Sequence, residues 1–173
     1  MPSIDESVES VAELLRGIPG ADQLFYTASD WGDWSKIWHV LGVTRSLMAR
    51  DPEIAIRLSV LLGLESAFVN GFLKSLFKRE RPEFEGERPL HLRQPKTSSF
   101  PSGHASSAFM AAAVLSDEHP AGRPLYYAAA AIVAYSRIHV KIHHATDVAG
   151  GLVVGIALGK LVKRAWPLGK ISW

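Results

Sequence analysis

The chain has 173 residues, of which 47% are hydrophobic and 21% charged, and its formal net charge is only +2. This small charge does not indicate a nucleic-acid partner, and the absence of cysteine excludes disulfides, thiolate metal sites and cysteine nucleophiles. We expect a single domain over residues 1–173. The mean hydropathy is slightly positive at +0.08, so the apolar residues of this charged chain must be concentrated in blocks.

Residues 1–30 are predicted to form an amphipathic N-terminal segment. Apolar residues recur at helical spacing over residues 4–16, with acidic residues between them: Ile4, Val8, Val11, Leu14 and Leu15. Gly17, Pro19 and Gly20 are expected to end this helix. No basic region precedes an apolar core, so we do not expect a signal peptide. The helix fits either a membrane surface or ordinary packing on the rest of the protein.

Ser29 or Asp30 can cap a second helix. A helical block is expected at residues 35–49. Three tryptophans follow at three- and four-residue steps: Trp31, Trp34 and Trp38. Their rings suit either a core-facing stripe or a set of anchors at a membrane interface.

Four further apolar blocks cover residues 54–73, 105–116, 125–136 and 148–162. The first is long enough to span a bilayer, and its Arg57 and Glu65 would have to face an end or a protein interior. The last has three glycines on one helix face, a close-packing surface that also offers a site for homo-oligomerisation: Gly151, Gly155 and Gly159. No alternating pattern predicts a strand. We therefore expect an all-α integral membrane bundle of about five transmembrane helices plus the N-terminal amphipathic helix.

One long polar segment, from Lys74 to Ser99, separates these blocks. It is rich in charges and contains Pro82, Pro89 and Pro95. Loops of this length in compact domains are commonly functional. We expect an active-site loop over residues 74–101.

Polar clusters lie where the apolar blocks end. In KSLFKRERP, Lys74 and Arg81 are two helical turns apart and can project in similar directions, although alone they could form a basic collar beside a membrane. In SSFPSGHASS, Ser102 and Gly103 precede a helical block, whose free backbone N–H groups suit an anion. Ser102 could equally be a plain helix cap. His104 adds a titratable group beside this turn.

The third cluster is RIHVKIHHATD, residues 137–147. Asp147 follows His143 by four residues and can orient its ring, which leaves the other ring nitrogen as a nucleophile or base. If the stretch were one continuous helix, His139, His143 and Asp147 would share a face and could bind zinc. Each histidine taken alone is more commonly a hydrogen-bonded structural residue.

Taken together, the three clusters favour phosphate over a metal. Lys74, Arg81 and Arg137 are fixed cations, which suit a phosphate dianion and are unfavourable neighbours for a metal ion. The same groups would stabilise a transition state with charge on the phosphoryl oxygens.

The motifs K-x6-RP at 74–82, PSGH at 101–104 and SR-x5-H-x3-D at 136–147 resemble the signatures of the type 2 phosphatidic acid phosphatase superfamily. This superfamily includes membrane lipid phosphatases, soluble bacterial acid phosphatases and vanadium haloperoxidases. The resemblance implies that His143 is the nucleophile and forms a phosphohistidine, that Asp147 orients it, and that His104 protonates the leaving oxygen. It implies no cofactor and no metal. The phosphate would be held by Lys74, Arg81, Ser102, Gly103 and Arg137.

Lys141 departs from the family pattern, because many members have glycine two residues before the nucleophilic histidine. A bulky cation at this position could alter the turn or add a contact to a lipid headgroup.

The resemblance implies an integral protein of the bacterial inner membrane that hydrolyses a lipid phosphate. Candidate substrates are phosphatidate, phosphatidylglycerophosphate, a polyprenyl phosphate or diphosphate, and a polyprenyl-phosphate-linked sugar phosphate. Membrane lipids are the other expected partners, and basic residues at both ends of the bundle leave the side of the active site unassigned. One alternative is a soluble acid phosphatase or vanadate-dependent peroxidase of the same superfamily. Another is a non-catalytic membrane protein that binds phospholipid headgroups.

Overall fold

The computed structural model describes residues 2–166, and all regular secondary structure in that range is helical, as predicted. Met1 and residues 167–173, the two ends of the expected domain, lie outside the described residues. The α-helices are α1 (Ile4–Glu13), α2 (Pro19–Gly32), α3 (Lys36–Ala49), α4 (Pro52–Ser66), α5 (Gly103–Glu118), α6 (Arg123–His139) and α7 (Ala145–Ala165).

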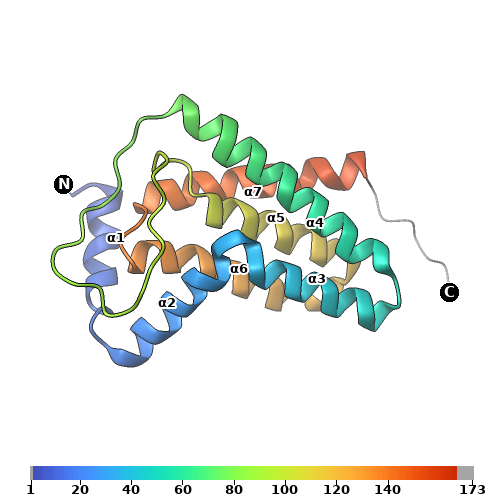
Figure 1. The fold of residues 1–173 in the computed structure, drawn as a ribbon, viewed down its shortest axis with the longest axis horizontal. Coiled ribbons are helices and arrows are strands. Elements are labelled where there is room, and N and C mark those ends of the chain that lie inside the picture. The colour runs from blue at the N-terminus through green and yellow to red at the C-terminus, as the bar shows by residue number, and fades with distance from the viewer. Residues whose placement is uncertain (1, 167–173) are drawn as a thin grey trace.

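Helix α5 lies inside the bundle, with α4, α6 and α7 packed against it (Figure 1). Its sequence consists largely of alanine, serine and other small residues, and most of its side chains are buried. Small side chains let neighbouring helices approach closely, so α5 can be covered on several sides at once. The N-terminal end of α5 thereby lies beside the end of the α4 continuation and beside the turn that joins α6 to α7.

The glycine face of α7 packs against α5 within the same chain. A Cβ on Gly151 would collide with the carbonyl oxygen of Ser102, and one on Gly155 with that of Ser106. Gly159 is also buried. The close-packing surface is therefore confirmed, and α5 of the same chain covers it. The possible homo-oligomerisation stays a prediction.

Two helical segments are long and apolar enough to cross a membrane. One is α7, and the other is α4 with its π-helical (Ala67–Phe72) and 3-10 (Leu73–Leu76) continuation, which together run from Pro52 to Leu76. Helices α3, α5 and α6 have 14, 16 and 17 residues, fewer than the roughly 20 of a typical span. The count of about five transmembrane helices stays a prediction.

The outer faces of α3, of α4 and of its continuation expose many large apolar side chains, a pattern that suits a lipid environment: Val40, Val43, Leu47, Ile56, Val60, Leu64 and Phe68. The charged residues of α4 face inward instead, since Arg57 is 1% and Glu65 3% exposed. The prediction that these two charges face an end or the interior of the protein is confirmed.

Helix α2 was not expected from the sequence. Pro19 and Gly20 lie at its start and do not act as breakers, because proline in the first helical turn loses no intrahelical hydrogen bond. Ser29 and Asp30 consequently lie inside α2 and do not cap the next helix.

The chain bends between α2 and α3, where Trp34 and Ser35 have φ angles of 55° and 58°. Because of this bend, the three tryptophan side chains do not share one face. Trp38 is fully buried, whereas Trp31 and Trp34 are 44% and 75% exposed. Only one of the three rings therefore belongs to a core-facing stripe.

Helix α1 packs against α6 and α7 (Figure 1). Ser3 caps it in a reciprocal arrangement with Glu6, and it ends at Glu13, three residues before the expected boundary. After Leu76, residues 77–102 form a long irregular segment. Lys74 lies in the helical turn before this segment, so the loop begins later than the expected residue 74.

Candidate active site

The three sequence clusters meet at one end of the bundle. The helical continuation of α4, the first turn of α5 and the turn between α6 and α7 line a cavity of about 220 Å³. Its wall includes Lys74, Gly103, His104 and His143. Residues far apart in the sequence thus form one polar site.

His143 is oriented by Asp147, with Ser99 between them. His143 Nδ1 lies 3.6 Å from Asp147 Oδ2, and Ser99 Oγ donates to the same oxygen at 2.5 Å. Ser99 Oγ also lies 3.3 Å from His143 Nδ1. Because the Ser99 proton is directed to Asp147, Ser99 Oγ accepts from Nδ1–H, and this assignment leaves Nε2 unprotonated. The sequence suggested the histidine and the carboxylate but not the serine.

His143 is 2% exposed, and burial lowers its pKa well below the ordinary value. The Asp147 carboxylate acts in the opposite direction, while the charges of Arg137 and Arg81 lower the pKa further. His143 is therefore a neutral imidazole at neutral pH. A neutral ring with an unprotonated Nε2 is the form required of a nucleophile or base.

Two arginines lie close to this imidazole. Arg81 Nη1 is 3.3 Å from His143 Nε2, and the same guanidinium donates to the carbonyl oxygen of Ile142 at 3.0 Å. Arg137 is fully buried and donates to Ser29 Oγ. Its Nε and Nη2 have no hydrogen-bond partner among the described residues. Buried donors without partners are costly, and the oxygens of an anion would satisfy them.

The first turn of α5 forms another wall. Ser102 Oγ accepts from the backbone N–H of Ala105 at 3.4 Å, so Ser102 does serve as the helix cap. A Cβ on Gly103 would lie 2.6 Å from Asn70 Oδ1, so a side chain there would displace the Asn70 amide from the cavity wall. The N–H groups of Gly103 and His104 have no intrahelical acceptor in this turn, a favourable arrangement for an anion.

His104 pairs with a carboxylate that the sequence did not indicate. Its Nε2 lies 3.1 Å from Oδ1 of Asp33, at the bend between α2 and α3. Partial burial acts to raise the pKa of Asp33, but His104, Arg137 and Arg93 outweigh it and the net shift is downward. Asp33 is therefore ionised at neutral pH. No local pattern marked it, because the partner histidine belongs to a different helix.

Further polar residues come from α4 and its continuation. Glu65, Ser66 and Asn70 also line the cavity. A carboxylate inside an apolar helix is costly unless it faces a polar interior, and this was the available sequence signal for Glu65.

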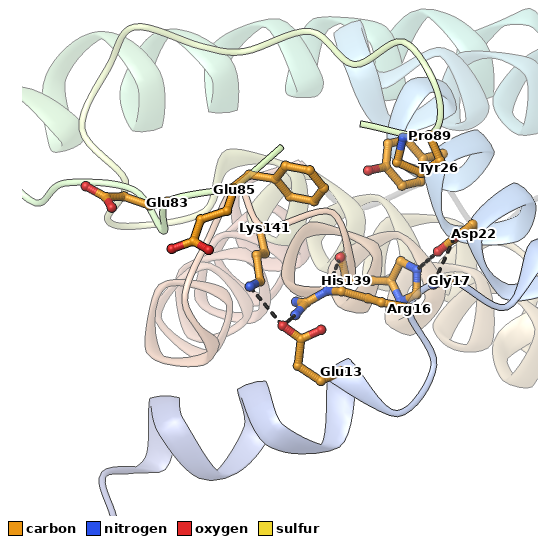
Figure 2. A pocket seen from close by; sticks show the side chains of 11 residues that line it. Glu13, Arg16, Gly17, Asp22, Tyr26, Glu83, Glu85, Pro89, His139 and Lys141 are labelled. Carbon is orange, nitrogen blue, oxygen red and sulfur yellow. Dashed lines mark hydrogen bonds and ion pairs between the residues drawn. The ribbon is translucent and has the colours of Figure 1, made fainter. Parts of the chain in front are cut away.

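The zinc site considered from spacing is not formed. Residues 140–144 are not helical, so the three candidate ligands do not share one helix face. His139 Nε2 lies 2.8 Å from Asp22 Oδ1 (Figure 2), while His143 faces Asp147. Among residues 2–166, no group of three or more His, Asp or Glu side chains is placed to hold a metal ion.

Lys141 has a φ angle of 48°, in the region that glycine adopts without strain. This conformation explains why glycine suits the position. The Lys141 side chain turns toward α1, where its Nζ lies 2.9 Å from Glu13 Oε1 (Figure 2). The anticipated contact with a substrate headgroup is therefore not supported.

Comparison with known proteins gives a match to the PAP2 superfamily model over residues 54–169. A decaprenylphosphoryl-5-phosphoribose phosphatase of Mycobacterium tuberculosis is 33% identical over 90 residues, which are 52% of this chain and 49% of that protein. A decaprenylphosphoryl-5-phosphoribose phosphatase of Mycolicibacterium smegmatis is 31% identical over 150 residues, which are 85% of this chain and 80% of that protein. The match to the first relative thus spans about half of that relative's length.

Among solved structures, a transmembrane PAP2-type phosphatidylglycerolphosphate phosphatase from Bacillus subtilis has a similar fold. Its TM-score is 0.72 at 23% sequence identity, over 97% of this chain and 87% of the other. At this level of identity the comparison concerns the fold. All three sequence motifs fall within the residues that match the family model.

Proposed function

Since the chain belongs to the PAP2 superfamily, we propose that it is a membrane phosphatase that hydrolyses a lipid phosphate through a phosphohistidine on His143. The observation that carries this proposal is a buried, neutral His143, oriented by Asp147 and flanked by Arg81 and Arg137. Histidine in this state has an unprotonated, nucleophilic nitrogen beside cations that suit a phosphoryl group.

In this proposal the phosphoryl oxygens are bound by Lys74, Arg81 and Arg137. The unpartnered Nε and Nη2 of Arg137 supply hydrogen bonds, and the free N–H groups of Gly103 and His104 supply others. Ser102 shapes this turn as a cap. The cations favour the dianionic ester and the charge of the transition state.

The first chemical step forms a bond between His143 Nε2 and phosphorus, while the bond from phosphorus to the leaving oxygen breaks. His104 gives its proton to that oxygen, so the leaving group departs as a neutral alcohol, or as a phosphate when the substrate is a diphosphate. The positive charge on the His143 ring is stabilised through Nδ1–H by Ser99 and Asp147.

The second step returns the enzyme to its starting state. His104, now neutral, takes a proton from water, and the resulting hydroxide oxygen attacks phosphorus. The bond from phosphorus to Nε2 breaks, inorganic phosphate leaves, and His104 is again protonated. No step of this cycle draws on a metal.

We assign the substrate to the lipid phosphates, with a polyprenyl-phosphate-linked sugar phosphate as the first candidate. The exposed apolar faces of α3 and α4 support a membrane-bound substrate. Glu65, Ser66 and Asn70 in the cavity wall suit a leaving group that carries hydroxyls, and two relatives are named for such a substrate. Phosphatidate, phosphatidylglycerophosphate and polyprenyl phosphates or diphosphates are the other candidates, and the bacterial inner membrane is the proposed location.

The test uses purified protein in detergent and measures phosphate release from each candidate lipid and from p-nitrophenyl phosphate. We expect release from at least one lipid, competitive inhibition by vanadate, undiminished activity in EDTA, and no release by His143→Ala. Full activity of His143→Ala, or a strict requirement for added zinc, would contradict the mechanism. Release from p-nitrophenyl phosphate alone would favour a soluble acid phosphatase, and vanadate-dependent bromide oxidation would favour a peroxidase.

A further inference from the structure

Helix α1 contacts both ends of the segment that carries the proposed nucleophile. We call residues 138–147 the catalytic turn, because they join α6 to α7 and include His143 and Asp147. Helix α1 lies outside the residues 54–169 that match the family model. Its contacts with the catalytic turn are polar and specific at each end.

At the Asp147 end, Asp5 of α1 binds two residues at once. Its carboxylate accepts from Thr146 N at 2.8 Å and from Thr146 Oγ1 at 2.9 Å. It also lies 2.7 Å from Arg79 Nη2. Partial burial acts to raise the pKa of Asp5, but the contacts with Thr146 and Arg79 outweigh it, and the net shift of the pKa is downward. Asp5 is therefore ionised. Arg79 in turn donates from Nη1 to Asp147 Oδ1 at 2.7 Å.

The two oxygens of Asp147 are thereby held separately. Oδ1 receives Arg79, whereas Oδ2 receives Ser99 and the backbone N–H of His144 at 2.8 Å and faces His143 Nδ1. The orientation of the carboxylate, which decides how Oδ2 faces Ser99 and His143 Nδ1, depends on the partners of both oxygens. Arg79 is one-third exposed, with a side-chain exposure of 33%. A long, partly exposed side chain is held in one geometry more firmly by two carboxylates than by one.

At the opposite end, Arg16 follows α1 and binds the carboxyl end of α6. It donates to the carbonyl oxygens of His139 at 2.7 Å and Ile138 at 2.8 Å. A cation is favourable at a helix C-terminus. Figure 2 shows this region beside a cavity of about 500 Å³, with Lys141 of the catalytic turn paired to Glu13 of α1.

We propose that α1 is a positioning element for the reaction, in which Asp5 acts through Arg79 and Thr146 to hold Asp147 in the orientation that directs His143. Arg16 and Lys141 fix the other end of the catalytic turn against the same helix. This inference rests on the proposed function. Asp5 and Arg79 do not touch the substrate and are positioning residues.

The first test is a double-mutant cycle on the full-length protein in detergent, with dioctanoyl phosphatidate as the probe. Asp5→Asn keeps an oxygen for Thr146 but loses the ion pair to Arg79. We expect kcat to fall about tenfold, the effect of losing one charge-assisted hydrogen bond, with KM nearly unchanged. Asp5→Asn combined with Arg79→Gln should be no slower than Arg79→Gln alone, because Asp5 acts through Arg79.

Arg79→Lys tests the same link without altering α1. It keeps the charge but loses the fork that reaches both carboxylates, so we expect a kcat between those of the wild type and Arg79→Gln. The matched control is Asp30→Asn, which breaks an exposed ion pair with Lys36 of 2.7 Å. This control should leave kcat unchanged.

The second measurement does not depend on turnover. Nitrogen NMR of ¹⁵N-histidine-labelled protein reports which ring nitrogen of His143 carries the proton. We expect the Nδ1–H form in the wild type and a larger share of the Nε2–H form in Asp5→Asn and Arg79→Gln. A purely structural role of α1 would lower thermal stability and leave this ratio unmoved.

An unchanged kcat and tautomer ratio in Asp5→Asn, or additive losses in the double variant, would overturn the inference. A wild-type protein that releases phosphate from none of the tested substrates would contradict the proposed function instead. The tautomer ratio would then still decide whether α1 orients His143.

Discussion

Oδ1 of Asp33 lies 3.1 Å from Nε2 of His104, although the two residues come from different helical segments. The site therefore contains two pairs of histidine and carboxylate. His143 with Asp147 is buried and neutral, as a nucleophile requires. The ionised Asp33 acts to keep a proton on His104, but burial of the ring and the charge of Arg137 outweigh it in the free site. In the proposed reaction, a bound phosphate dianion adds the negative charge that favours the protonated ring of a general acid.

Removing the charge of Asp33 should weaken acid catalysis by His104. In Asp33→Asn we expect kcat to fall about tenfold and the basic limb of the pH profile of kcat/KM to move to lower pH, because the protonated His104 loses its counter-charge. The inhibition constant of vanadate should change little, since the phosphate ligands remain. The comparison variant is Asp117→Asn, which breaks the ion pair with Lys163. A basic limb that stays in place would show that Asp33 does not act on His104.

Replacing His104 should separate the two steps of the reaction. For His104→Ala we expect turnover to fall by about 10²–10⁴-fold, the usual contribution of a general acid or base. With a substrate whose leaving group needs little protonation, such as p-nitrophenyl phosphate, the phosphohistidine should form and persist, because the base for hydrolysis is missing. Acid-labile, alkali-stable labelling of the protein by ³²P-phosphate ester measures this intermediate. Labelling that survives in His143→Ala would place the intermediate on another residue.

Acid should destabilise the folded protein through His143. In the unfolded chain this histidine takes up a proton near its ordinary pKa of about 6.5, whereas in the folded protein its pKa is well below that value. The unfolded state therefore binds more protons below pH 6.5, and the free energy of unfolding falls as the pH drops through this window. Above pH 6.5 the contribution is absent. Thermal midpoints in detergent between pH 5 and 7.5 should show a shallower acid loss in His143→Gln, and equal slopes would contradict the buried neutral state.

The α5–α7 contact should tolerate no side chain at Gly151. Because a Cβ there would collide with the carbonyl oxygen of Ser102, we expect Gly151→Ala to lower the free energy of unfolding by about 1–3 kcal/mol and to reduce activity by moving the first turn of α5. Gly63→Ala is the control, since no atom lies within 4 Å of its added Cβ. It should be neutral or stabilising by roughly 0.5–1 kcal/mol. Equal thermal midpoints for the two variants would contradict the close approach.

Local patterns in the sequence were sufficient to predict the helical fold class and the three polar clusters. Helical periodicity and apolar blocks depend on neighbours within a few residues, so α3 to α7 were predictable within a few residues of their ends. The pairing of His143 with Asp147 was suggested by its spacing of four. The role of Pro19 was misjudged because the same residue can end one helix or begin another, and only the packing of α2 decides between them.

The remaining features required the tertiary structure, because they join residues from separate elements. No spacing connects Asp33 with His104, Ser99 with His143, or Asp5 with Arg79. The glycine face of α7 predicted close packing but not its partner, since a small-residue surface suits any helix of complementary shape. By itself the sequence determined which chemical groups the chain carries and which short segments become helices. The packing of those helices decided which carboxylate faces which histidine, because that choice depends on distances between elements that no local pattern encodes.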